Sequence, residues 1–214
     1  MDRSSVAIVI PAYNEQDTIG QVVSRASAHG MPIVVDDASK DDTKANAEHN
    51  GAIVIRHEQN RGYDGALNSG FAAASERDFE FIITMDADGQ HDESLIEKFL
   101  SLLAESADIV VGVRPARARL SERVFCFVTR KLYGIRDPLC GMKGYRMELY
   151  RALGHFDSYG SIGTELTLFA AKRKYRIEQV PVPIARREAG ATRFGRSLKA
   201  EWKIFRALLK GLFA

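Results

Sequence analysis

The stretch VAIVIPAYNE at residues 6–15 decides the fold, because five apolar, mostly β-branched residues run directly into a polar cluster. A continuous Val/Ile run is typical of a strand that is covered on both faces of a sheet. An apolar run followed by polar residues returns at 33–39 and at 81–91. The pattern predicts buried strands that are followed, at their carboxyl ends, by polar residues able to bind a ligand.

Expected strands and helices alternate along the first half of the chain. The strands are at 6–10, 33–36, 52–56, 81–86 and 109–113, and the helices are at 15–29, 42–50, 63–76 and 92–106. This order predicts an α/β fold with an open, mostly parallel, Rossmann-like sheet flanked by helices. Ligands of such sheets bind beyond the carboxyl ends of the strands.

The second half of the chain does not continue the regular alternation of strands and helices. Its expected elements are a basic linker at 114–119, a helix at 121–133, a glycine-containing segment with strand character at 137–145, a helix at 164–174, an edge strand at 175–185, a mobile loop at 186–196 and an amphipathic helix at 197–213. The edge position is expected because Pro181 and Pro183 cannot donate to a central sheet ladder.

Composition and charge limit the function classes. The 214 residues are 45% hydrophobic and 27% charged, which fits one soluble globular domain and excludes disordered, collagen-like and disulfide-rich chains. The net charge of +2 hides an asymmetry, since residues 1–112 carry 8 basic and 20 acidic side chains and residues 113–214 carry 22 and 8. The acidic half fits a cation site, and the basic half fits anionic groups or a membrane surface.

Cysteine spacing and the start of the chain predict a cytoplasmic location. Cys126 and Cys140 stand apart from any Cys/His cluster, so neither a disulfide framework nor a zinc site is indicated. Residues 1–5 lead into the first apolar run without signal-peptide features. No apolar run approaches the ~18 residues of a membrane-spanning helix.

The strongest site signal is MDADGQH at residues 85–91, where Asp86 and Asp88 flank Ala87 directly after an expected strand. Two carboxylates in this position suit a hard divalent cation such as Mg²⁺ or Mn²⁺, with Gln90 as a neutral oxygen ligand and diphosphate oxygens in the remaining positions. A plain Asp/Gly turn is the alternative, and this motif alone does not separate the two.

Three more polar clusters accompany this motif. PAYNE at 11–15 and DDAS at 36–39 end the first two strands and are placed to bind a base and a ribose, with capping and turn formation as the alternative for Asn14 and Ser39. NRGYDGALNSG at 60–70 has closely spaced glycines without the spacing of a P-loop or of GxGxxG. We expect this segment to pack closely beside a nucleotide.

The order of these motifs resembles the inverting family 2 glycosyltransferases of GT-A fold over nearly the whole chain. The matching segments are IVIPAYNE at 8–15, VVDDASKDDT at 34–43, residues 60–70, DAD at 86–88 and a C-terminal Arg-x-x-Gly. DADGQH at 86–91 and REAGATR at 187–193 look most like the branch of dolichyl-phosphate mannose synthases and bacterial polyprenyl-phosphate glycosyltransferases.

The resemblance implies roles for individual residues. The implied donor-binding residues are Pro11, Tyr13, Glu15, Val35, Asp37, Asp86, Ala87, Asp88, Gln90, Arg114, Arg187 and Arg193. Asp86, Asp88 and Gln90 would surround the metal, and Arg114 and Arg187 would contact phosphates. Thr192 and Arg193 replace the usual Ser-Lys pair, which keeps the charge but changes the geometry offered to a phosphate.

The acceptor side is implied by DPLCGMKGYR at 137–146, where Cys140 and Lys143 replace the usual serine and arginine of the family. Cys140 is also explained as a small buried residue. A sugar hydroxyl acceptor needs a general base, for which Asp137 and Glu165 are the candidates, whereas a lipid phosphate is already anionic and needs only positioning. For Glu165 the alternative is a carboxylate that stabilises a helix start.

The last expected helix bears on the choice of acceptor. It carries a basic stripe and an apolar stripe, formed by Lys199, Lys203, Arg206 and Lys210 and by Leu198, Trp202, Phe205, Leu209 and Leu212. Such a helix fits a membrane interface with anionic lipid, and it equally fits packing on the protein core. The basic residues at 186–196 favour the membrane.

We therefore expect a metal-dependent enzyme that moves a sugar from a GDP- or UDP-sugar to a polyprenyl phosphate, in cell-envelope glycan synthesis at the cytoplasmic face of the membrane. The expected domain spans 1–196, with a donor half at 1–113 and an acceptor half at 114–196, and a membrane-interface helix follows at 197–214. Three alternatives remain: transfer to a saccharide hydroxyl, sugar-1-phosphate nucleotidyl transfer, and a non-catalytic nucleotide-sugar-binding scaffold. Nucleic acid is not an expected partner, and a homo-oligomer or a membrane-anchor partner is left open.

Overall fold

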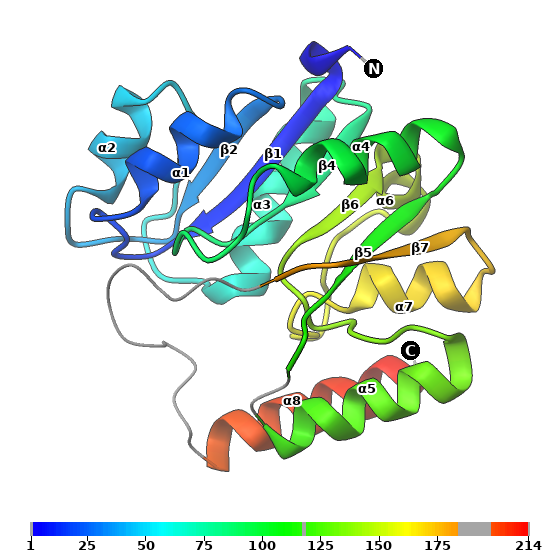
Figure 1. Ribbon diagram of the computed structural model, residues 1–214. Helices are drawn as coiled ribbons and strands as arrows, with labels where there is room; N and C mark the ends of the chain where they lie inside the picture. The colour runs from blue at the N-terminus through cyan, green and yellow to red at the C-terminus, as the bar shows by residue number, and fades with distance from the viewer. Residues whose placement is uncertain (1, 117–118, 184–197, 214) are drawn as a thin grey trace.

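Seven strands form one sheet in the order β3-β2-β1-β4-β6-β5-β7 (Figure 1). They are β1 (Val6–Ala12), β2 (Met31–Asp36), β3 (Ile53–Arg56), β4 (Phe81–Thr84), β5 (Ile109–Val113), β6 (Lys143–Arg146) and β7 (Ile177–Pro181). The computed structural model describes residues 2–116, 119–183 and 198–213. Within these residues β6 alone runs antiparallel to its neighbours, β4 and β5. The predicted mostly parallel sheet is confirmed, as is the edge position of β7.

Helices cover both faces of this sheet (Figure 1). They are α1 (Ile19–Ala26), α2 (Thr43–His49), α3 (Gly62–Glu76), α4 (Leu95–Glu105), α5 (Leu120–Tyr133), α6 (Met147–Leu153), α7 (Glu165–Lys172) and α8 (Leu198–Phe213). The sequence did not predict α6, and α1 begins four residues later than expected because residues 14–18 form a hydrogen-bonded loop. The predicted loop at 186–196 lies outside the described residues.

The two faces of β1 pack into two separate cores. Val6, Ile8 and Ile10 join a cluster that includes α1 and α4, while Ala7 and Val9 join a cluster that includes α3. This division follows from the alternation of side chains along a strand. A Cβ at Gly70 of α3 would lie 2.3 Å from a Val9 methyl carbon, so glycine is what lets this helix lie directly on the sheet. The close packing expected for residues 60–70 is confirmed on the sheet, and its place beside a nucleotide stays a prediction.

The reversed direction of β6 places its first residue at the carboxyl edge of the sheet. Lys143 pairs with Thr84, the last residue of β4. The segment that leads into β6 therefore lies beside the polar residues that follow β4. The expected strand at 137–145 begins only at Lys143, and the preceding residues form loop.

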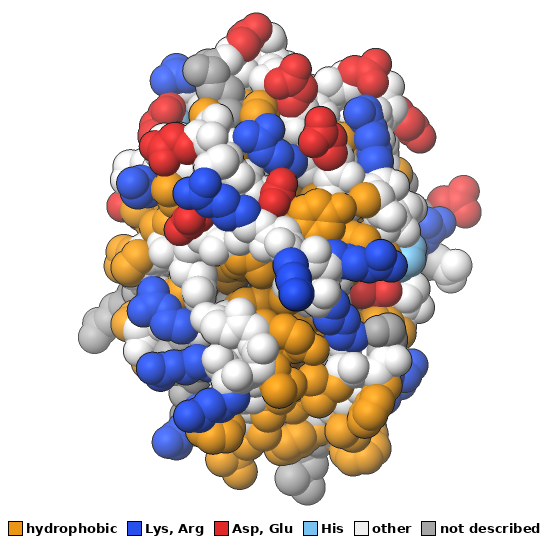
Figure 2. Space-filling model, turned by 90° about the vertical axis from the view of Figure 1, so that its right-hand side faces the viewer, with side chains coloured by type: hydrophobic (Ala, Val, Ile, Leu, Met, Phe, Trp, Pro, Cys, Tyr) orange, Lys and Arg blue, Asp and Glu red, His pale blue; other side chains and the backbone are white. Residues whose placement is uncertain are grey.

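A third apolar cluster joins α5, α7 and α8, and its buried members are Phe125, Leu168, Ile204, Ala207 and Leu208. One face of α8 thus packs on the core. Another face leaves Trp202, Leu209 and Phe213 exposed by 66%, 53% and 87%. Hydrophobic side chains gather over the lower part of the molecule in Figure 2. The core-packing alternative for the last helix is confirmed, and it coexists with an exposed apolar face.

Among the described helices, none combines the length and apolar character needed to cross a bilayer.

Candidate functional site

The loops after β1 and β2 hold each other in place at the carboxyl edge of the sheet. The Asn14 amide N–H donates to Ser39 Oγ at 2.8 Å, and Asn14 Oδ1 accepts from the Lys40 N–H at 2.8 Å. The Glu15 N–H donates to Thr43 Oγ1 at 2.7 Å. The capping and turn interpretation therefore holds for Asn14 and Ser39. These bonds fix a loop in which Pro11, Tyr13 and Glu15 are partly exposed; we call these three residues the nucleoside rim. They lie at the carboxyl end of β1, where the sequence predicted them.

The loop after β4 presents the two aspartates. Asp86 donates its backbone N–H to His91 Nδ1 at 3.2 Å, and its carboxylate is 38% exposed. Asp88 Oδ1 accepts from the Gln90 N–H at 3.1 Å. Thr18 Oγ1 donates to the Ala87 carbonyl at 2.7 Å, which ties this loop to the start of α1. This loop is thus a hydrogen-bonded turn that also carries two partly exposed carboxylates.

The acceptor-side segment packs directly against Asp86. A Cβ at Gly141 would lie 2.5 Å from Asp86 Oδ2, so only glycine fits beside this carboxylate. Thr84 Oγ donates to the Gly141 carbonyl at 2.7 Å and fixes that approach. The sequence motif contained Gly141, but its contact with Asp86 depends on the pairing of β4 with β6.

The residues around Asp86 and Asp88 fit a metal that arrives with a diphosphate. No group of three or more His, Cys, Asp or Glu side chains suited to a metal exists within the described residues. Mg²⁺ is commonly held by one or two carboxylates together with substrate phosphate oxygens and water. The two partly exposed carboxylates of this loop could share a metal with substrate phosphates in this way. They are too few to surround a metal ion with protein ligands alone.

Asp37 is buried and engaged by the protein. Its carboxylate accepts from His57 Nδ1 at 2.7 Å and from the backbone N–H groups of Arg61 and Gly62 at 2.8 Å each. His57 was not singled out from the sequence, since it contacts Asp37 only once β2 and β3 are paired. Asp37 therefore positions the start of α3, and its expected contact with the nucleoside stays a prediction.

Two other expected donor contacts are also buried. The Val35 side chain is fully buried between β2 and α3, and Ala87 is 4% exposed. Their side chains thus belong to the core beneath the edge, and their expected contact with the donor stays a prediction. Arg187 and Arg193 lie outside the described residues.

Arg114 and Asp137 form a two-pronged ion pair. Arg114 Nε and Nη2 donate to the two Asp137 oxygens at 2.8 and 2.9 Å, and the Arg114 backbone N–H donates to Oδ2 at 3.1 Å. Burial disfavours the charged guanidinium, but the bonds to Asp137 outweigh it and raise the pKa of Arg114. Asp137 is fully buried. Its geometry is that of a residue that positions Arg114, and its role as a general base stays an untested prediction.

Glu165 is the first residue of α7, and its carboxylate is engaged by the preceding loop. It accepts from the Ser158 N–H at 2.6 Å and from the Ser158 hydroxyl at 2.8 Å, and it lies 2.9 Å from His155 Nε2. The geometry supports the helix-start interpretation rather than a base that faces the acceptor.

Lys143 is buried at the site edge, and its ammonium donates to the Gly163 carbonyl at 2.7 Å. Burial lowers the pKa of Lys143 to about 8, although the neighbouring Cys140, Asp137 and Asp86 oppose the shift. Burial and Asp137 raise the pKa of the Cys140 thiol to about 11, so this residue acts as small core filling.

Tyr63 lies close to these residues, although the sequence did not single it out. It lies in the first turn of α3, half-buried, and a Cβ at Gly163 would be 3.2 Å from Tyr63 Cε1 and 3.9 Å from Lys143 Nζ. Burial, followed by the charge of Asp86, raises the pKa of Tyr63. In the sequence, only its position within the glycine-rich segment 60–70 indicated that Tyr63 could lie near a ligand.

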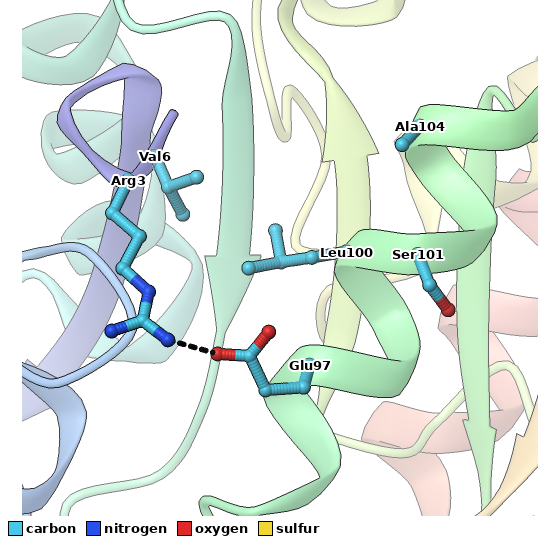
Figure 3. A pocket seen from close by; sticks show the side chains of 6 residues that line it. All are labelled: Arg3, Val6, Glu97, Leu100, Ser101 and Ala104. Atoms are coloured by element: carbon cyan, nitrogen blue, oxygen red, sulfur yellow. Dashed lines mark hydrogen bonds and ion pairs between the residues drawn. The ribbon is translucent and has the colours of Figure 1, made fainter. Parts of the chain in front are cut away.

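A separate cavity lies at the opposite edge of the sheet. It has a volume of about 330 Å³ between the start of β1 and α4, and its lining includes Val6, Leu100 and the Arg3–Glu97 ion pair at 3.0 Å (Figure 3). The amino ends of parallel strands rarely carry the ligand site of such a sheet. This cavity contains none of the predicted site residues.

Comparison with known proteins gives concordant results. The model of glycosyl transferase family 2 matches residues 7–123. A dolichyl-phosphate hexose transferase from Haloferax volcanii is 31% identical over 88% of this chain and 86% of its own. A UDP-N-acetylglucosamine–dolichyl-phosphate N-acetylglucosaminyltransferase from Methanococcus voltae is 29% identical over 95% of this chain and 94% of its own.

A solved structure shows the same fold. Glucosyl-3-phosphoglycerate synthase from Mycobacterium tuberculosis, in complex with Mn²⁺, UDP and phosphoglyceric acid, superposes with a TM-score of 0.78 over 98% of this chain and 78% of its own, at 24% identity. The predicted GT-A fold is confirmed.

Proposed function

This chain belongs to glycosyl transferase family 2, and from that premise we propose that it transfers a sugar from a nucleotide diphosphate donor to a polyprenyl phosphate, with Mg²⁺ or Mn²⁺. One observation carries the choice of acceptor. Asp137 and Glu165, the two carboxylates proposed as general bases, are both occupied by protein donors. A hydroxyl acceptor needs a base, whereas a phosphate acceptor does not.

The rim formed by Pro11, Tyr13 and Glu15 binds the nucleoside in this proposal. Asp86 and Asp88, with Gln90, hold the metal and the diphosphate. The bound metal supplies Lewis-acid neutralisation of the leaving diphosphate. The names of the Haloferax volcanii and Methanococcus voltae relatives support a polyprenyl-type phosphate as acceptor.

Two cations on the acceptor side position the reacting phosphate. Lys143 and Arg114 lie at the same edge as Asp86, on the reversed strand β6 and at the end of β5. Their fixed positive charges favour the approach of an anionic acceptor to the anomeric carbon. Preorganised charge of this kind is usually the largest single contribution to catalysis. Arg187 and Arg193 extend this set in the proposal.

A membrane interface at the cytoplasmic face is the proposed location. α8 exposes Trp202, Leu209 and Phe213, and α5, which packs against it, exposes Leu120 and Phe127. Exposed lysines and arginines accompany these apolar side chains on the same two helices: Arg123, Arg130, Lys131, Lys199, Arg206 and Lys210. Apolar residues beside basic ones fit the surface of a bilayer that contains anionic lipid.

A donor screen by thermal denaturation tests the donor half of the proposal. We expect one or more GDP- or UDP-sugars to raise the melting temperature in the presence of Mn²⁺, because a ligand that binds only the native state stabilises it. The Asp86→Asn variant should lose that shift. If no donor raises the melting temperature of the wild-type protein, the proposal is wrong.

A further inference from the structure

Two side chains lie within electrostatic reach of Asp86. Tyr63 comes from the first turn of α3, and Lys143 comes from the start of β6. Both approach the same point, since a Cβ at Gly163 would lie 3.2 Å from Tyr63 Cε1 and 3.9 Å from Lys143 Nζ. The charge of Asp86 acts on both of them. Tyr63, Lys143 and Asp86 are therefore neighbours at the carboxyl edge of the sheet.

The loop that closes this region is held in an unfavourable conformation. Ile162 has a φ of 57°, a value that is costly for a β-branched residue. α3 maintains it, because Asp64 accepts the Gly163 N–H at 2.7 Å and Asn68 Oδ1 accepts the Asp157 N–H at 3.1 Å. Strain that the surrounding structure maintains clusters at ligand sites. The same loop supplies the carbonyl that holds Lys143.

The Tyr63 side chain is equipped for a ligand with both apolar and polar edges. It is half-buried, and its hydroxyl makes no hydrogen bond to the described residues 2–116, 119–183 and 198–213. A phenol ring offers an apolar face, and its hydroxyl both donates and accepts. A hexose presents C–H faces and hydroxyl edges, which match this combination.

We propose that Tyr63 contacts the transferred sugar and determines which sugar is accepted, with its hydroxyl bonded to a sugar hydroxyl. This inference rests on the proposed function. Gly141 packs directly against the Asp86 carboxylate, so in this proposal the sugar of a diphosphate held at Asp86 and Asp88 lies on the side where Tyr63 and Lys143 are. Tyr63 is uncharged and polar, so in this proposal it selects among hexoses without competing for the phosphates.

The test compares a nucleoside diphosphate with its sugar conjugates. Titration calorimetry with Mn²⁺ measures the affinities of UDP, GDP and their hexose conjugates for the wild type and for Tyr63→Phe and Tyr63→Ala. We expect nucleoside diphosphate affinity to stay within about twofold. Affinity for the preferred nucleotide sugar should fall about three- to tenfold in Tyr63→Phe, the equivalent of one hydrogen bond, and further in Tyr63→Ala.

A nucleotide sugar that lacks one sugar hydroxyl tests whether Tyr63 bonds to that hydroxyl. Removing the sugar hydroxyl that bonds Tyr63 should weaken binding to the wild type but not to Tyr63→Phe, because the variant has already lost that bond. The control is Tyr175→Phe, whose ring packs against Phe169 and which lies outside the site. It should bind every ligand as the wild type does.

Three outcomes would overturn the inference. Equal losses for the diphosphate and the nucleotide sugar would show that Tyr63 only supports the fold. Unchanged binding in Tyr63→Phe and Tyr63→Ala would show that the sugar lies elsewhere. If the wild type binds nucleoside diphosphates but no nucleotide sugar, the proposed function falls as well, which separates that failure from the first two.

Discussion

Arg114 and Asp137 illustrate how a polar residue of the site acts through its neighbour. The motif 137–146 marked Asp137 as functional, but its partner lies 23 positions earlier in the chain. Residue types and spacing identified the segment, while the ion pair depends on β5 and β6 being neighbours. For the same reason Glu165 and Asp37 were predicted at the site, but their hydrogen-bond partners were not.

Asp137→Asn should lower stability and turnover together. The variant removes the closest counter-charge of Arg114 and leaves Glu122, 3.9 Å away, so we expect a cost of about 3 kcal/mol. Chemical denaturation measures the loss. Asp78→Asn is the matched control, because Asp78 is 93% exposed in its pair with Arg151 and should cost less than about 1 kcal/mol. Full stability with abolished turnover in Asp137→Asn would restore Asp137 as a general base and favour a hydroxyl acceptor.

Lys143 should make acceptor use depend on pH. Its pKa of about 8 lies below the ordinary 10.5, so the charged form predominates below pH 8 and is lost above it. We expect the KM for a phosphate acceptor to rise above pH 8, and Lys143→Arg to flatten that rise because a guanidinium stays charged. Identical pH profiles would remove Lys143 from acceptor binding.

The same shift affects stability with a defined sign. Burial penalises the charged amine in the folded state, so the folded pKa lies below the unfolded one. The cost is fully present below pH 8, and the contribution of Lys143 to stability improves as the pH rises toward 10.5.

Among the helices and strands, continuous apolar runs in the sequence predicted the strands most reliably. They located every strand of the first half of the chain, because strands buried on both faces need Val and Ile throughout. Short amphipathic elements were less visible. α6 was missed since its 7 residues span only two turns, and β6 is defined by two antiparallel partners that a local pattern does not reveal.

The two faces of α8 should respond differently to truncation. Trp202→Ala removes an exposed side chain and should weaken binding to anionic vesicles about tenfold, with stability changed by less than about 0.5 kcal/mol. Ile204→Ala creates a cavity next to α5 and α7 and should cost about 2–4 kcal/mol. Sedimentation with vesicles and chemical denaturation separate the two effects. Unchanged vesicle binding by Trp202→Ala would argue against the membrane interface.

At the scale of the whole molecule, the charge asymmetry corresponds to two kinds of site. The acidic half supplies the edge around Asp86 and Asp88, and the basic half supplies Arg114, Lys143 and the exposed cations of α5 and α8. Many remaining charges are solvated surface. A net charge of +2 therefore combines a donor half with a phosphate and membrane half.

Salt should weaken membrane binding without abolishing it. Electrostatic attraction to anionic lipid is screened over about 10 Å at 0.1 M salt and over about 3 Å at 1 M, while apolar insertion is not screened. Vesicle binding measured across that range should fall to a plateau, and binding to vesicles of neutral lipid should lie near that plateau. Salt-independent binding would contradict a role for the basic residues.

The products of the transfer reaction show which acceptor the enzyme uses. The purified chain is incubated with Mn²⁺, the nucleotide sugar that stabilises it, and either a polyprenyl phosphate or a saccharide with free hydroxyls, and products are identified by mass spectrometry. We predict a glycosyl polyprenyl phosphate that is absent in Asp86→Asn and in metal-free samples. Glycosylation of the saccharide alone would contradict the account.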